Sequence, residues 1–262
     1  MQNDNLKELF DFANEVRALL LEKYEYVEVQ KVVKNNDEIL VGVTVRSESE
    51  NVAPNVYLND FYERFADNRM SMQDVSVQIQ EIVDKSAHKE ALKHIDTSVF
   101  MNKEELIKRV IVRLVGTDNN EQYLSSCVSV PVVEGLTAVL YVYVSSDEQG
   151  VMSSKLTKAM FDILDMPVEA VYQIAKRNTA QKLPCRIDSM LNVLGQMLGD
   201  DISDMDDADI SMYVLSNNVC INGATAILYE DVLKDFCNEH GYKELYILTS
   251  SVHEVILVPK QD

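Results

Sequence analysis

Two strongly apolar runs near the C-terminus constrain the fold of this chain more than any other segment. They cover residues 245–248 and 255–258, and a short polar segment from Thr249 to Glu254 separates them. Short runs rich in Ile, Val, Leu and Tyr are typical of buried strands, and a polar segment between two such runs is typical of a tight turn. The sequence therefore predicts a β-hairpin that closes a hydrophobic core.

The composition is that of an ordinary globular protein with a strong acidic excess. The 262 residues are 47% hydrophobic and 26% charged, which suits one large domain or two smaller ones. Lys plus Arg number 24 against 43 Asp plus Glu, so the net charge is −19. This charge repels phosphate groups and anionic lipid. We therefore expect no direct nucleic-acid binding and no membrane binding, and a basic protein is the partner that the charge favours.

The N-terminus and the cysteines point to a cytoplasmic protein. Residues 1–9 lack the basic and then apolar layout of a signal peptide. The longest purely apolar run, 138–144, is far shorter than the roughly 18 residues that a spanning helix needs. The cysteines lack metal-type spacing and are expected to be reduced and buried. They are Cys127, Cys185, Cys220 and Cys237.

Hydrophobic periodicity predicts a mixture of helices and hairpin-like strands. Helices are expected over residues 6–20, 54–65, 71–83, 156–164, 167–175, 188–198 and 232–237, and a short helix is expected to start at residues 102–105. Strands are expected over residues 26–33, 39–45, 110–115, 128–133, 136–144, 212–215, 245–248 and 255–258. This order indicates an α+β or mixed α/β fold with mostly antiparallel or mixed sheets and flanking helices.

Two subdomains are the expected division of the chain. Residues 1–90 would form a helix–hairpin–helix–helix unit, and residues 97–262 a mixed α/β domain. Residues 200–209 hold six aspartates and are expected to form a solvated loop in the second domain. This loop lacks the glycine and the distal glutamate of an EF-hand, so no calcium site is predicted.

The common catalytic and cofactor motifs are absent. The sequence has no G-x-x-x-x-G-K, G-x-G-x-x-G, G-x-S-x-G or H-E-x-x-H string. No cofactor and no metal are therefore predicted.

The polar segment of the C-terminal hairpin supplies the catalytic candidates, which are Ser250, Ser251, His253 and Glu254. On one strand, residues i and i+2 lie about 6.5–7 Å apart. A nucleophile and its base need about 2.6–3.2 Å, so Ser251 and His253 can form a dyad only across a bulge or a tight turn. Turn capping by the serines, ligand or partner binding, and catalysis all remain open for this segment.

Four further residues are candidates for ligand binding: Asn178, Arg186, Asn222 and Gly223. Arg186 could bind an anionic ligand with both guanidinium nitrogens, or it could form a structural ion pair with one of the many acidic residues. Asn222-Gly223 is a turn signal.

Several strings together resemble a bacterial family, the domain of unknown function 5688 family, found mainly in anaerobic gut bacteria. The strings are KNN at 34–36, PNVYLNDFYE at 54–63, MYVLSN at 212–217, NGA at 222–224 and SSVHEV at 250–255. The chain departs from the family pattern at Thr249, where a proline is usual, and at residues 67–69, where a glycine is expected. A weaker likeness in layout is to the YtpQ-type uncharacterised family. The resemblance implies no activity.

Three functions remain as hypotheses at this point. The first is a non-enzymatic protein–protein interaction or regulatory protein. The second is a small-ligand binder or hydrolase-like enzyme that uses Ser250, Ser251 and His253. The third is an acidic nucleic-acid mimic, which requires carboxylates in two ordered rows. The sequence does not determine the oligomeric state.

Overall fold

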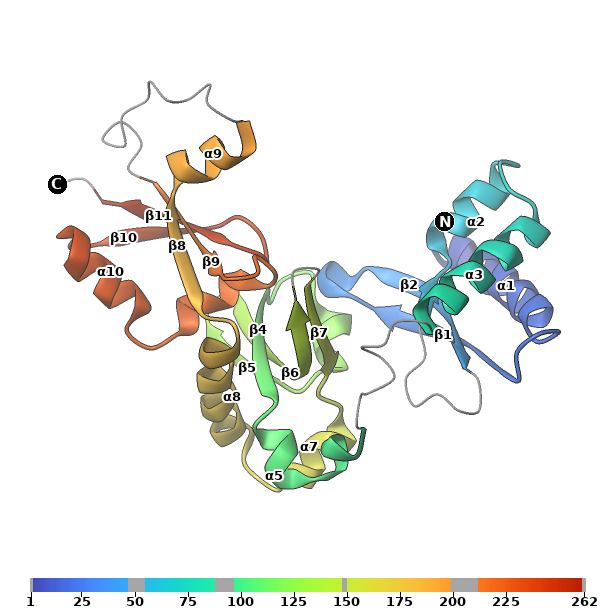
Figure 1. Ribbon diagram of the computed structural model, residues 1–262, viewed down its shortest axis with the longest axis horizontal. Coiled ribbons are helices and arrows are strands. Elements are labelled where there is room, and N and C mark those ends of the chain that lie inside the picture. The colour runs from blue at the N-terminus through green and yellow to red at the C-terminus, as the bar shows by residue number, and fades with distance from the viewer. Residues whose placement is uncertain (1, 47–54, 88–96, 148–149, 199–211, 261–262) are drawn as a thin grey trace. The chain divides into compact units, whose positions relative to one another are not determined.

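The computed structural model describes residues 2–46, 55–87, 97–147, 150–198 and 212–260, and it has the predicted mixed α+β fold (Figure 1). Its strands form three antiparallel sheets. The chain divides into two compact units. Unit 1 holds Met1–Thr97 and Asn119–Tyr123, and unit 2 holds Ser98–Asp118 and Leu124–Asp262. The predicted limits at residues 90 and 97 stay a prediction, because residues 88–96 lie outside the described part of the chain.

Unit 1 is a three-stranded sheet with helices packed against it. Its elements are α1 (Gln2–Leu20), β1 (Tyr26–Val33), η1 (Asn35–Asp37), β2 (Ile39–Arg46), β3 (Asn55–Tyr57), α2 (Asn59–Ala66) and α3 (Met72–Ala87). The strands have the order β1-β2-β3. The turn between β1 and β2 places Asn36 and Asp37 at positive φ, as their residue types predict.

The prediction of a helix from Pro54 is wrong at its start. Residues Asn55–Tyr57 form β3, which pairs with β2 through Gly42, Val43 and Thr44. Because this pairing extends the backbone, the helix begins only at Asn59. Pro54 itself lies outside the described residues.

A short segment from later in the chain completes unit 1. The backbone N–H of Asn36 donates to Asn120 Oδ1 at 2.8 Å. The Asp37 carboxylate accepts from the N–H groups of Gln122 at 3.1 Å and Tyr123 at 2.8 Å. The chain therefore leaves unit 1, enters unit 2, returns for Asn119–Tyr123 and then re-enters unit 2.

Unit 2 contains two sheets. Its elements are η2 (Thr97–Met101), α5 (Lys103–Ile107), β4 (Val110–Gly116), β5 (Ser129–Val133), β6 (Leu136–Asp147), β7 (Gly150–Lys155), α7 (Lys158–Leu164), α8 (Val168–Lys182), β8 (Cys185–Ser189), α9 (Met190–Leu198), β9 (Tyr213–Asn217), η4 (Gly223–Leu228), α10 (Val232–His240), β10 (Leu245–Thr249) and β11 (Val255–Pro259). Helix α6 (Glu121–Ser125) begins in unit 1 and ends in unit 2. In one sheet the order is β4-β6-β5, with β7 also paired to β6. The other, called here the C-terminal sheet, has the order β10-β11-β9-β8.

Two sequence predictions in unit 2 need correction. The helix expected over 188–198 begins at Met190, because Cys185–Ser189 pairs with β9 as strand β8. Apolar and polar residues do alternate from Cys185 to Asp188, but this period of two spans only four residues. Strand β7 is also missing from the prediction, since its serines and lysine give no apolar run. The acidic segment 200–209 lies outside the described residues.

The C-terminal sheet has one well-covered face. Val255, Leu257 and Pro259 of β11 are buried. Val255 and Leu257 belong to a core cluster with Leu215 of β9 and Phe236 of α10, which lies beside this sheet (Figure 1). The hairpin is therefore present as predicted, and β11 is its buried strand.

The prediction that residues 245–248 are also buried is wrong. Tyr246 is 55% exposed, Ile247 39% and Leu248 50%. Strand β10 lies at the edge of the sheet and has β11 as its neighbour. Among the described strands β10 has no second neighbour, and its apolar side chains stay in contact with water.

Candidate functional site

The hairpin turn brings three of the four catalytic candidates together. The hydroxyls of Ser250 and Ser251 both donate to Glu254 Oε1, at 3.2 Å and 2.8 Å. Ser251 Oγ also accepts from the backbone N–H of His253 at 2.9 Å. The serine hydroxyls thus close the turn through a carboxylate and the backbone, and neither hydroxyl bonds to the His253 ring.

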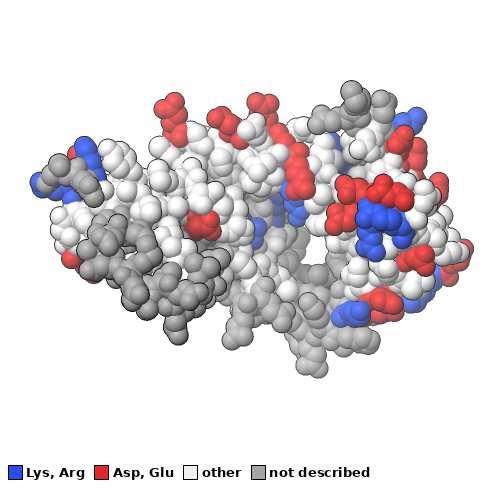
Figure 2. All heavy atoms as spheres, turned by 90° about the horizontal axis from the view of Figure 1, so that it is seen from above, with Lys and Arg blue, Asp and Glu red and all other residues white. Residues whose placement is uncertain are grey.

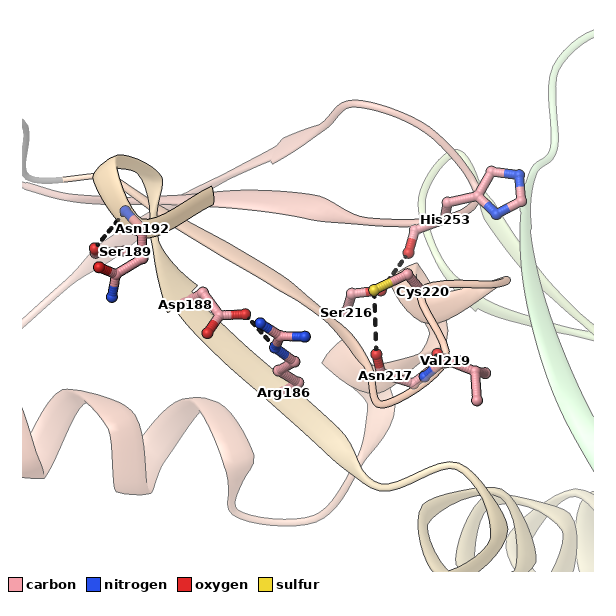
Figure 3. Close-up of polar contacts among 9 residues, drawn as sticks. All are labelled: Arg186, Asp188, Ser189, Asn192, Ser216, Asn217, Val219, Cys220 and His253. Atoms are coloured by element: carbon pink, nitrogen blue, oxygen red, sulfur yellow. Dashed lines mark hydrogen bonds and ion pairs between the residues drawn. The ribbon is translucent and has the colours of Figure 1, made fainter. Parts of the chain in front are cut away.

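The His253 ring contacts a different segment. Its Nδ1 accepts from the backbone N–H of Asn222 at 3.3 Å, and its side chain is exposed. The carbonyl of His253 accepts from Ser216 Oγ at 2.7 Å, while the ring points away from that serine (Figure 3). His253 therefore ties the hairpin turn to the loop that follows β9.

Gly223 fits tightly within this junction. A Cβ atom at Gly223 would lie 2.1 Å from Ser216 Oγ, 2.6 Å from the Asn217 nitrogen and 2.6 Å from the His253 carbonyl oxygen. The next residue, Ala224, donates its N–H to the Val252 carbonyl at 3.3 Å. Asn222 adopts the left-handed conformation of a turn residue, with φ 54°. The structure thus joins Asn222 to the His253 ring by a hydrogen bond, and it packs Gly223 against the His253 carbonyl.

Arg186 lies on β8, the other edge of the C-terminal sheet. It forms an ion pair with Asp188 of the same strand (Figure 3). The hydrogen bond to the Asp188 carboxylate, together with its charge, raises the pKa of Arg186. This contact corresponds to the structural ion pair that the sequence leaves open.

Asn178 lies at the open side of strand β4. Its Nδ2 donates to the carbonyls of Ile107 at 2.8 Å and Val110 at 2.9 Å. Two buried threonines, which sequence reasoning missed, continue this row. Thr179 Oγ1 accepts from the Val112 N–H at 2.9 Å, and Thr225 Oγ1 accepts from the Leu114 N–H at 3.0 Å.

These contacts seal the open side of β4 with side chains. Strand β4 pairs with β6 on one side, so alternate backbone groups at 110, 112 and 114 point to the other side. Buried backbone groups need partners, and residues of α8 and η4 supply them here. A polar residue at an inner helix position, such as Thr179 one turn after Ala175, is the sequence signal for such a role.

The other edge strands also carry protection against unwanted pairing. On β1 the Arg17 guanidinium donates to the Val27 carbonyl at 2.9 Å. Strand β3 has three residues, β5 contains Pro131, and β8 carries the Arg186–Asp188 ion pair. Short strands, proline and charged side chains are the usual devices that keep an edge from pairing with another chain.

Strand β10 differs from these edges, because it presents apolar side chains and open backbone groups together. The Lys260 N–H donates to the Glu244 carbonyl at 3.1 Å, so Glu244 and Lys260 form a hydrogen-bonded pair between the two strands. Hydrogen-bonded pairs alternate along an antiparallel pair, so Tyr246 and Leu248 also bond to β11. The backbone groups of Leu245, Ile247 and Thr249 therefore point away from β11. We call these groups, with the exposed side chains of Tyr246, Ile247 and Leu248, the open edge of β10.

Two hollows border unit 2 near β8. One, of about 590 Å³, is lined in part by Asp188, Asp235, Glu239 and His240. The other, of about 650 Å³, is lined in part by Lys176 and Arg177. Within the described ranges, no group of three or more His, Cys, Asp or Glu residues could hold a metal ion.

Cys185 lines both hollows, and burial raises the pKa of its thiol to about 11. Because the thiolate is the reactive form, Cys185 should resist alkylation at pH 8. The prediction that the cysteines are buried is wrong for Cys220, which is exposed. Iodoacetamide is therefore expected to modify Cys220 well before Cys185 in the native protein. Peptide mass spectrometry over a time course measures this order, and both thiols should react at similar rates in urea. Equal native rates would contradict the raised pKa and partial burial of Cys185.

These features define a two-unit α+β protein in which one sheet keeps an apolar edge open. The chain belongs to the Family of unknown function (DUF5688), whose profile matches residues 9–262. Comparison with curated proteins and with solved structures finds no significant match in either set. Among the helices of the described residues, none is both long and apolar enough to cross a membrane.

Proposed function

We propose that this protein acts through protein–protein contacts, as an interaction or regulatory protein, and that the open edge of β10 is its binding surface. The observation that carries this proposal is the run of three consecutive exposed apolar side chains on an edge strand: Tyr246, Ile247 and Leu248. The partner would add a strand to the C-terminal sheet.

Strand addition uses both parts of this surface. The open backbone groups of Leu245, Ile247 and Thr249 would form main-chain hydrogen bonds, as in other complexes built by β-augmentation. The exposed side chains would lose contact with water, which contributes about 25 cal/mol per Å² of apolar area. Backbone pairing supplies general affinity, and the side chains select the partner.

The geometry of the hairpin turn gives less support to a hydrolase. Ser250 and Ser251 donate to Glu254, and the His253 ring accepts from the Asn222 backbone. A nucleophile needs a hydrogen bond to its base, and this turn has no such pair of serine hydroxyl and imidazole.

The charge distribution bears on two further possibilities, a nucleic-acid mimic and a basic partner. On the face seen in Figure 2, acidic side chains are scattered, and Lys and Arg side chains lie among them. This pattern does not favour a nucleic-acid mimic, which needs ordered rows of carboxylates. The net charge of −19 would still add long-range attraction for a basic partner.

Site-specific photo-crosslinking tests the proposed binding surface. Benzoylphenylalanine replaces Tyr246, and in a matched control it replaces Val133, which is 58% exposed on the edge strand β5. In native host cells, irradiation should give discrete adducts from position 246 and none from position 133. Equal labelling at both positions, or no adduct from position 246, would argue against β10 as the binding surface.

A further inference from the structure

We infer that the strand that adds to β10 is the β10 strand of a second copy of this chain. The two strands would run antiparallel about a two-fold axis at Ile247. This inference rests on the proposed function and names the partner for the same surface.

The direction of the β10 backbone groups permits this pairing. The backbone groups of Leu245, Ile247 and Thr249 all point to the open side. A two-fold axis at Ile247 places Ile247 opposite its own counterpart and Leu245 opposite Thr249 of the second copy. All three residues would then lie in hydrogen-bonded pairs, each of which exchanges two main-chain bonds. An isologous interface of this kind closes after two copies and leaves no further edge on β10.

The side chains select this register over its neighbours. With the axis at Ile247, Tyr246 of one copy lies opposite Leu248 of the other, so apolar groups meet apolar groups. An axis at Leu245 would place Tyr246 opposite Glu244 and Ile247 opposite Lys243. An axis at Thr249 would place Leu248 opposite Ser250 and Ile247 opposite Ser251. An axis at Tyr246 or Leu248 would keep only two hydrogen-bonded pairs within Leu245–Thr249, against three for the axis at Ile247. The axis at Ile247 thus combines opposed apolar pairs with the most main-chain bonds, so it is favoured.

The charges that flank β10 are balanced and complementary in the same register. Lys243 would lie opposite Ser251 of the second copy, whose hydroxyl donates to Glu254 at 2.8 Å. A lysine of one copy thus comes close to a carboxylate of the other at both ends of the strand pair. Glu244 is already paired with Lys260 at 2.5 Å. The edge itself therefore carries no local excess of acid that would favour a basic partner.

The affinity follows from the size of the interface and the total charge. A pair of five-residue strands buries less than the roughly 1,200 Å² of a standard stable interface, so a dissociation constant on the order of 10–100 μM is expected. Each copy carries −19, and the two copies repel each other at long range. Salt screens this repulsion, so self-association should strengthen with ionic strength. Higher ionic strength would instead weaken the binding of a basic partner, because salt screens the attraction.

Cysteine crosslinking tests the register directly in the full chain. In a Cys220→Ser background, Ile247→Cys should form a covalent dimer with a short bis-thiol reagent, because the two axial residues lie about 5.5 Å apart between Cα atoms. Thr249→Cys is the matched control on the same strand. Its counterpart lies four residues further along, at roughly 13 Å, and it should stay monomeric. Efficient crosslinking of Thr249→Cys with none at Ile247→Cys would overturn the register.

Sedimentation equilibrium up to a few hundred μM tests the association itself. The wild-type chain should dimerise, more so at higher salt, and Ile247→Lys should lower the association at least tenfold by opposing two lysines at the axis. Val133→Lys, a change at a more exposed apolar position on another edge, should leave the dimer intact. A monomeric wild-type chain would overturn the inference. The proposed function would stand in that case if position 246 still crosslinks to another protein, and it would fall if position 246 gives no adduct.

Discussion

Replacing Gly223 with alanine is expected to destabilise the protein by about 3 kcal/mol, at the upper end for an overpacked site. The added Cβ would lie 2.6 Å from the Asn217 nitrogen and 2.6 Å from the His253 carbonyl oxygen. Both are backbone atoms, so relief requires movement of β9 or of the hairpin turn. Such movement would also disturb the hydrogen bond from Ser216 to His253. Urea unfolding followed by circular dichroism measures the loss as a lower midpoint.

Gly116→Ala is the matched control for this experiment. A Cβ at Gly116 would meet the Asp118 carbonyl oxygen at 3.9 Å, an ordinary van der Waals contact. This variant should keep a midpoint close to that of the wild type. If both alanine variants unfold at the same urea concentration as the wild type, the close packing of Gly223 is wrong.

Replacing Thr225 with valine is expected to cost about 2 kcal/mol, because it leaves the buried N–H of Leu114 without its acceptor. Thr179→Val should cost a similar amount, of about 2 kcal/mol, by removing the acceptor of the Val112 N–H. Valine matches threonine in shape, so the loss reports the hydrogen bond rather than a cavity. Native-state hydrogen exchange should show faster exchange of the Leu114 amide in the first variant and of the Val112 amide in the second.

Serine at the same two positions separates the hydroxyl from the methyl group. Thr225→Ser and Thr179→Ser keep the acceptor, so they should retain amide protection even though each loses a buried methyl. Equal loss of protection in the serine and valine variants would indicate that the hydroxyls do not cap β4.

Local patterns predict much of this fold, because many of its elements depend on near neighbours. The first hairpin follows from turn residues that accept positive φ at Asn36 and Asp37. The start of α3 follows from Ser71 and Asp74, which cap each other's backbone N–H groups at 3.2 Å and 3.1 Å. Burial of β11 follows from its apolar side chains.

The features that local patterns miss depend on pairing between distant segments. The sequences of β10 and β11 are equally apolar, yet one is buried and the other lies at an edge. This difference depends on which strand pairs with β9, 30 or more residues earlier, and no local pattern contains it. Strand β8 is missed for the same reason, since its pairing with β9 overrides its polar composition.

In the candidate site, too, local sequence identifies residues, while contacts between distant segments determine their geometry. Residue types alone single out Ser250, Ser251, His253 and Glu254. The direction of the His253 ring depends on the Asn222 backbone, 31 positions away in sequence. Asn178 is also found from the sequence, but its partners, the carbonyls of Ile107 and Val110, appear only when α8 packs beside β4.

The return of residues 119–123 to unit 1 has a consequence for dividing the protein into fragments. A fragment that ends at residue 97 contains Asn36 and Asp37 but lacks Asn120, Gln122 and Tyr123, which bond to them. A single cut after residue 97 therefore leaves neither fragment with a whole unit 1. Fragments 1–97 and 98–262 would instead complement each other when expressed together, so the chain provides a natural site for a split protein.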